Sequence, residues 1–163
     1  MKWAMKWAVL VLAVVIAAPA LAAATPLTPS AIAADIKAHG ADAVVTRLFT
    51  HGDYDRVLDH IDKGEAEWVA LAPKLAPGTD AGTAESLVIA LAFALPKNPR
   101  AVLALITGKD AFPVEDVCGA PFIEGTIGDI PAYVKKAKAA VARVTDLKLA
   151  KAKAACLAQL DKA

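Results

Sequence analysis

The residue types best suited to chemistry gather in one stretch of the chain, HGDYDRVLDHIDKGE at residues 51–65. Imidazoles and carboxylates can bind a metal ion or exchange protons with a substrate. Helical spacing, however, places the later aspartates opposite the valine, leucine and isoleucine of this stretch, as on the solvated face of an amphipathic helix. We therefore expect a charged surface rather than a site. The side chains concerned are His51, Asp53, Asp55, Asp59, His60 and Asp62.

Other signatures of catalysis or metal binding are missing from the sequence. Beyond residue 24 the only serines are Ser30 and Ser86, and neither lies in a GxSxG or SxxK motif. No CxxC, HxxxH or calcium-loop spacing occurs. The sequence thus predicts no catalytic residue, no metal site and no cofactor, and it favours a protein that is not an enzyme. The alternative is an enzyme or a metal-handling protein that uses residues 51–62.

The cysteines of the chain are Cys118 and Cys156. In an oxidising compartment two such cysteines are expected to form a disulfide. Cys156 also falls on the apolar face of a predicted helix, so two separate buried thiols are the alternative. We expect the bond, which would hold the last helix against the irregular segment before it.

Residues 1–24, MKWAMKWAVLVLAVVIAAPALAAA, have the three-part pattern of an export signal. Two lysines precede an apolar run, and Pro19 with the small residues Ala20 and Ala22 follows it. We expect a signal peptide at residues 1–22, with residues 23–163 left as a single domain that is periplasmic or secreted. An uncleaved membrane anchor is the alternative, because the run approaches the roughly 20 apolar residues of a spanning helix. After cleavage no transmembrane segment is expected.

The composition favours an all-α fold. Alanine dominates a chain in which 57% of residues are hydrophobic and only 6% aromatic, whereas strands favour β-branched and aromatic residues. We predict a compact bundle, or a short array of helical hairpins, of about seven or eight helices. The array is suggested by a faint internal repeat. Residues 32–53 and 91–110 each have the pattern of a helix, a turn and a second helix.

Caps and breakers predict where these helices lie. Thr28-Pro29 and Asn98-Pro99 are N-cap signals, whereas Gly40, Gly64 and Pro96 are stop signals. The segment SLVIALAFAL at 86–95 is apolar almost all round and is expected to be the central buried helix. The predicted helices are 29–40, 41–50, 53–64, 65–72, one from Thr79 or Thr83 to 95, 98–108, and two after residue 130.

One long loop rich in glycine and proline, residues 108–131, is predicted to precede the last two helices. Long loops in compact domains are often functional. Apolar side chains on such a loop either pack on the core or meet a partner, and we predict a partner-facing surface here. Its candidate binding residues are Phe112, Val114, Phe122, Ile123 and Glu124.

Charge is distributed unevenly along a chain whose net charge is only +1. From Pro131 onward the chain has eight Lys and Arg residues, and its only acidic residues there are Asp146 and Asp161. Such lysines usually solvate a helix face, and an exported protein rarely meets nucleic acid, so no nucleic-acid partner is expected.

The sequence therefore indicates an exported, non-catalytic protein-binding module, similar in class to inhibitor or immunity proteins, whose partner is another periplasmic or cell-envelope protein. The further alternative is a structural protein of the envelope that places its basic last helices on anionic lipid.

Overall fold

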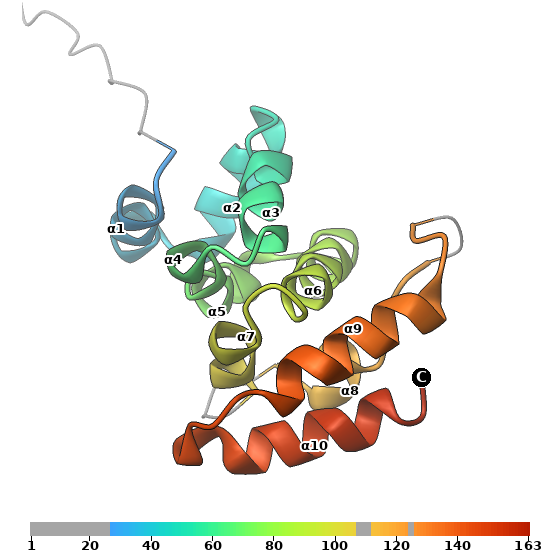
Figure 1. The fold of residues 1–163 in the computed structure, drawn as a ribbon. Coiled ribbons are helices and arrows are strands. Elements are labelled where there is room, and N and C mark those ends of the chain that lie inside the picture. The colour runs from blue at the N-terminus through green and yellow to red at the C-terminus, as the bar shows by residue number, and fades with distance from the viewer. Residues whose placement is uncertain (1–26, 107–111, 124–125) are drawn as a thin grey trace, which may run out of the picture.

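The computed structural model describes residues 27–106, 112–123 and 126–163, and this part of the chain forms α-helices and short 3-10 turns without a strand (Figure 1). The predicted all-α, bundle-like fold is therefore confirmed. The expected signal peptide at 1–22 lies outside the described residues. The helices are α1 (Pro29–His39), α2 (Ala41–Thr50), α3 (Tyr54–Asp62), α4 (Ala66–Val69), α5 (Ala72–Leu75), α6 (Ala81–Ala94), α7 (Pro99–Leu105), α8 (Val114–Cys118), α9 (Ile130–Ala142) and α10 (Ala150–Leu160).

The first two helices begin and end where the sequence predicts. The Thr28 side chain accepts a hydrogen bond from the Ala31 N–H at 3.2 Å, and Pro29 occupies the first turn of α1. Gly40, with a φ of 85°, ends α1 and begins α2. This left-handed φ is costly for any residue with a Cβ, which explains the glycine between the two helices.

Two boundaries differ from the prediction. The helix expected at 65–72 is two short ones, α4 and α5, because Pro73 enters the first turn of α5 instead of ending α4. The helix expected to begin at Thr79 or Thr83 is α6, and its N-cap is Asp80. The Asp80 carboxylate accepts the Thr83 N–H, and the Thr83 hydroxyl accepts the Asp80 N–H, each at 2.9 Å.

Helix α6 is the central buried helix, as predicted. Its Leu87 and Leu91 are buried, as is Leu95 at its end, and it packs against α3 on one side and α8 on another. Two buried tyrosines from other helices donate hydrogen bonds to its backbone. The Tyr54 hydroxyl donates to the Thr83 carbonyl at 2.8 Å, and the Tyr133 hydroxyl donates to the Ala92 carbonyl at 2.9 Å.

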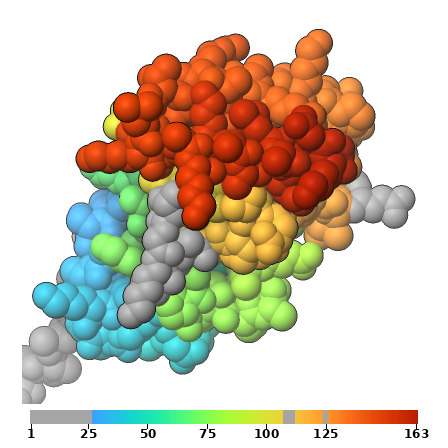
Figure 2. Space-filling view, turned by 90° about the horizontal axis from the view of Figure 1, so that it is seen from below, coloured from blue at the N-terminus to red at the C-terminus, as the bar shows by residue number. Residues whose placement is uncertain are grey.

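The C-terminal helices α9 and α10 lie side by side and antiparallel at one end of the molecule (Figure 1). Figure 2 shows this end from below, with α10 in red and the segment that contains α8 in yellow-orange beside it. Helix α8 was not predicted. It lies inside the expected loop 108–131, and it packs against α10 through buried Val117 and Cys118.

The sulfur atoms of Cys118 and Cys156 lie 2.05 Å apart, which is the distance of a disulfide bond. Both side chains are fully buried, and Leu149, Ala152 and Leu160 are buried on the same face of the last helix, as the sequence predicted. The pair would tie α8 to α10 across 38 residues of sequence. No helix of the described segments is long and apolar enough to cross a membrane.

Candidate binding surface

The charged cluster at 51–65 is occupied by pairs with neighbouring side chains. Arg56 Nη1 lies 2.7 Å from Asp53 Oδ1, and Lys97 pairs with Asp62. The Asp59 carboxylate is exposed and has no partner among the described residues. Most carboxylates of the cluster therefore balance a nearby cation or face solvent.

The histidines of this cluster are also separated from one another. His60 stacks on Trp68 with ring centroids 4.4 Å apart, and its Nδ1 lies 2.8 Å from a Glu65 carboxylate oxygen. His51 is exposed at the end of α2. Across residues 27–106, 112–123 and 126–163, no group of three His, Cys, Asp or Glu side chains is placed to hold a metal ion.

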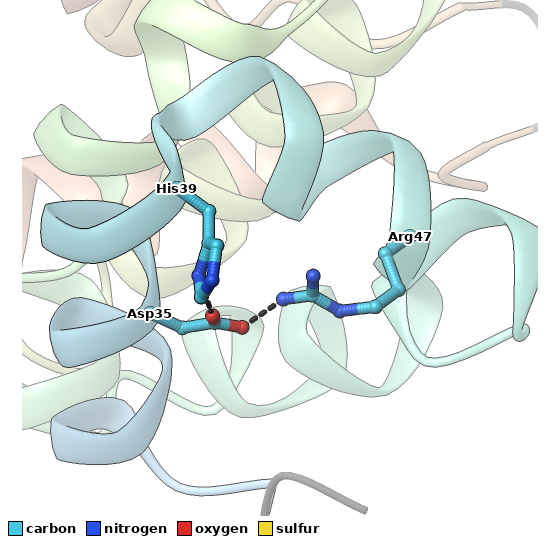
Figure 3. A network of polar contacts seen from close by, with 3 residues as sticks. All are labelled: Asp35, His39 and Arg47. Atoms are coloured by element: carbon cyan, nitrogen blue, oxygen red, sulfur yellow. Dashed lines mark hydrogen bonds and ion pairs between the residues drawn. The ribbon is translucent and has the colours of Figure 1, made fainter. Parts of the chain in front are cut away.

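A second polar network joins α1 to α2 (Figure 3). The Asp35 side chain is only 11% exposed, and both of its carboxylate oxygens are engaged. His39 Nδ1 lies 2.7 Å from Oδ1, and the Arg47 guanidinium donates to Oδ2. Because one carboxylate serves two cationic or polar partners from different helices, this network fixes the angle between the helices.

A groove of about 640 Å³ lies between α9 and the end of α6, and we call it the α9 groove. One wall is a stripe of α9 side chains at helical spacing, next to the stripe that packs on the core. The other wall is formed by the end of α6 and by Ile127. Its lining residues are Phe93, Pro96, Lys97, Ile127, Asp129, Ala132, Tyr133, Lys136, Ala139, Ala140 and Arg143.

Phe93 and Tyr133 line the α9 groove, and we call these two rings its aromatic base. Phe122 packs between Phe93 and Tyr133, with ring centroids 4.8 Å and 4.7 Å apart, and meets Tyr133 edge-on. Such aromatic contacts fix the rings in a defined arrangement. Burial raises the pKa of Tyr133 well above the ordinary tyrosine range, so its hydroxyl stays protonated as a donor to α6. The base is therefore rigid and apolar.

The rim of the α9 groove is cationic. Lys136 and Arg143 are exposed on α9, and neither has an ion pair within the described segments. Lys97 on the opposite wall pairs with Asp62. The one acidic residue of the groove, Asp129, is used locally, because its carboxylate accepts the Ala132 N–H at 2.8 Å as the N-cap of α9. The groove thus combines an apolar base with uncompensated positive charge.

A smaller hollow lies on the other side of Phe93. It is formed mainly by α3 and α6, and Ile123 and Thr126 close it. The Ile123 side chain is 58% exposed, which makes it one of the few large apolar side chains on the described surface that face solvent. Phe93 therefore lines both hollows, whereas Ile127 lines the α9 groove and Ile123 and Thr126 line the smaller one.

The structure places the predicted binding residues in different environments. Phe112 and Val114 are half-buried and pack on the core around α8, and Phe122 is half-buried against the aromatic base. Ile123 is exposed beside the groove, and Glu124 lies outside the described residues. The sequence analysis missed Phe93 and the cations of α9. The signal for Lys136 and Arg143 was a second stripe along α9, which consists of positions 132, 136, 139, 140 and 143 at the spacing of one helix face.

Comparisons of the chain with protein-family models, with curated proteins and with solved structures found no match.

Proposed function

We propose that the chain is an exported, non-catalytic binding protein that holds another protein in the α9 groove. The observation that carries the proposal is the groove itself, an aromatic base bordered by Lys136 and Arg143, which have no counter-charge in the described part of the chain. Protein interfaces commonly combine a buried aromatic or apolar centre with a polar rim, and aromatic residues and arginine contribute most to affinity.

The residues around the groove support binding rather than catalysis. Its lining consists of aromatic and small apolar side chains together with lysine and arginine. No His, Cys, Ser or Glu is among these lining residues. In the cluster at 51–65, by contrast, Asp53, His60 and Asp62 are paired with Arg56, Glu65 and Lys97. A partner that covers the groove would remove the ring of Phe93 and the exposed side chain of Ile123 from water, which stabilises a complex.

Export is part of the proposal. It is supported by the signal pattern of residues 1–24 and by Cys118 and Cys156, which lie at disulfide distance. Disulfides persist in oxidising compartments outside the cytosol. The intact mass of the protein recovered from the cell that produces it should correspond to a chain that begins at Ala23 or Thr25. Recovery of only the full-length chain in the membrane fraction would contradict export.

The binding proposal is tested by filling the groove. The variant Ala139→Trp places an indole on the exposed groove side of α9, and the matched control Ala154→Trp places one on the exposed outer face of α10. Each tagged protein is used to capture partners from a periplasmic extract, and candidates are confirmed by reconstitution from purified proteins at fixed stoichiometry. We expect Ala154→Trp to retain the partner and Ala139→Trp to lose it. A partner that both variants retain would overturn the proposed surface.

A further inference from the structure

We infer that the segment of the partner seated in the α9 groove is an amphipathic helix that carries acidic side chains, an inference that rests on the proposed function. The first argument is shape. The α9 side chains that line the groove run from Asp129 to Arg143 at intervals of three and four residues. At 1.5 Å per residue this wall is about 21 Å long. A second helix lying along it can place apolar side chains at the same spacing into the groove.

The second argument is the size of the side chains on this wall. Three of its positions are alanines, Ala132, Ala139 and Ala140. Helix axes pack roughly 8 to 10 Å apart, and small side chains at the contact allow the nearer approach. Phe93 in the aromatic base supplies a larger apolar surface for an anchoring side chain. The groove therefore has a wall of small side chains and an apolar base, which together can accommodate a docked helix.

The third argument is charge. Lys136 and Arg143 are seven residues apart on α9, which places them two turns apart on one face, roughly 10.5 Å along the axis. Neither has a counter-ion among the described residues, and the only carboxylate of the groove caps α9. Carboxylates two turns apart on the docked helix would meet both cations. Complementary charges of this kind raise the association rate and select the partner.

An anionic lipid surface would also be attracted by Lys136 and Arg143, but its shape does not match that of the groove. The cations stand on the rim of a concave groove, whereas a bilayer offers a flat surface that would not reach the base around Phe93. The groove therefore favours a convex helix, and lipid binding becomes an outcome of the test.

The test uses synthetic helical peptides and the purified chain of residues 23–163. One labelled peptide of about 18 residues carries Leu at positions i, i+3, i+4 and i+7 with Glu beside them, and a matched peptide carries Lys in place of Glu. Fluorescence anisotropy measures their affinities for the wild-type protein and for two variants. The groove variant is Lys136→Glu with Arg143→Glu, and the control is Lys148→Glu with Lys151→Glu, exposed residues outside the groove. Vesicles of phosphatidylglycerol and phosphatidylcholine are tested in parallel.

We expect the acidic helix to bind at least about tenfold more tightly than the basic helix, with an affinity that falls as salt rises. The groove reversal should remove this preference, and the control reversal should leave it within about twofold, because rim charges away from the contact act only at long range. Equal binding of the two peptides, an unaffected groove variant, or vesicle binding lost on groove reversal would overturn the inference.

The inference and the proposed function fail in different ways. If capture of the protein partner is lost in Ala139→Trp but the acidic peptide does not compete for it, the groove binds a protein and the helix inference is wrong. If capture is unchanged in Ala139→Trp, the groove is not the binding surface and both are wrong.

Discussion

Two charged regions of the molecule differ in what their charges do. Around α3, carboxylates and imidazoles are close in sequence, and the structure holds most of them in ion pairs or a ring stack. Along α9, Lys136 and Arg143 have no such partners within the described segments and border an apolar groove. The region around α3 has the residue types of an active site, but these side chains are not arranged around a common site. The second has ordinary residue types in an arrangement that can bind.

The surroundings of a charged side chain decide whether it is available to a partner more than its residue type does. An exposed ion pair contributes little to stability, about 0 to 1 kcal/mol, and each member satisfies the other. A cation without a counter-ion beside an aromatic base is available to a partner.

The largest effect is expected from the cysteine pair, which lies between α8 and α10. Replacing Cys118 and Cys156 by Ala should lower the free energy of unfolding by about 3 to 4 kcal/mol, as expected for a bond that closes 38 residues. Urea unfolding of oxidised wild type, reduced wild type and the double variant measures the difference. Two thiols that react freely in the unfolded, unreduced protein would show that no bond forms.

The next effect is expected at the base of the groove. Phe122→Ala removes a ring that contacts both Phe93 and Tyr133, and should cost about 2 kcal/mol, less than the roughly 3 to 5 of a fully buried phenylalanine. The neighbouring control Ile123→Ala removes an exposed side chain and should change stability by no more than about 0.5 kcal/mol. Thermal unfolding separates the two. Equal losses would mean that Ile123 is also part of the core.

A smaller effect is expected in the charged cluster at 51–65. His60→Ala removes the ring stack on Trp68 and the contact with Glu65, and should cost about 1 kcal/mol. His51→Ala should be neutral within about 0.5 kcal/mol, because the side chain is exposed. Calorimetry with zinc, copper and nickel should show no tight stoichiometric binding. Sub-micromolar binding that is abolished when His51→Ala and His60→Ala are combined would show that this region is a metal site.

The smallest effect is a pH dependence at the start of α6. The Thr83 hydroxyl, and then its backbone N–H, donate to Asp80 and hold the pKa of that carboxyl below its ordinary range. A lowered pKa in the folded state stabilises the fold above the unfolded pKa of about 3.9, and this contribution disappears as the pH falls through the folded pKa. The stability difference between wild type and Asp80→Asn should therefore be largest at neutral pH and vanish in strong acid. A difference that does not vary with pH would contradict this origin.

Much of the fold could be predicted because its signals are local. Thr28-Pro29, Gly40 and Asn98-Pro99 set helix ends through bonds to adjacent backbone, and the apolar run at 86–95 needed no partner to be identified as buried. Helix α8 could not be predicted in this way. It is five residues long, and its buried residues pack on α10, a helix distant in sequence.

The candidate site was harder to predict because it depends on two segments far apart in sequence. Phe93 is a half-buried residue near the end of α6, and Lys136 looked like one more solvated lysine. Only the packing of Tyr133 under Phe122 shows that these residues share a groove. The loop hypothesis nevertheless named Phe122, which packs against the aromatic base of the groove, and Ile123, which lines the neighbouring hollow.

The central claim is that a partner protein covers the α9 groove and leaves the charged cluster of α3 free. Hydrogen exchange with mass spectrometry, on the free protein and on the reconstituted complex, tests it most directly. The account predicts slower exchange in peptides that contain α9 and the end of α6, with no change in Tyr54–Asp62. Slower exchange in Tyr54–Asp62 with none along α9 would contradict it.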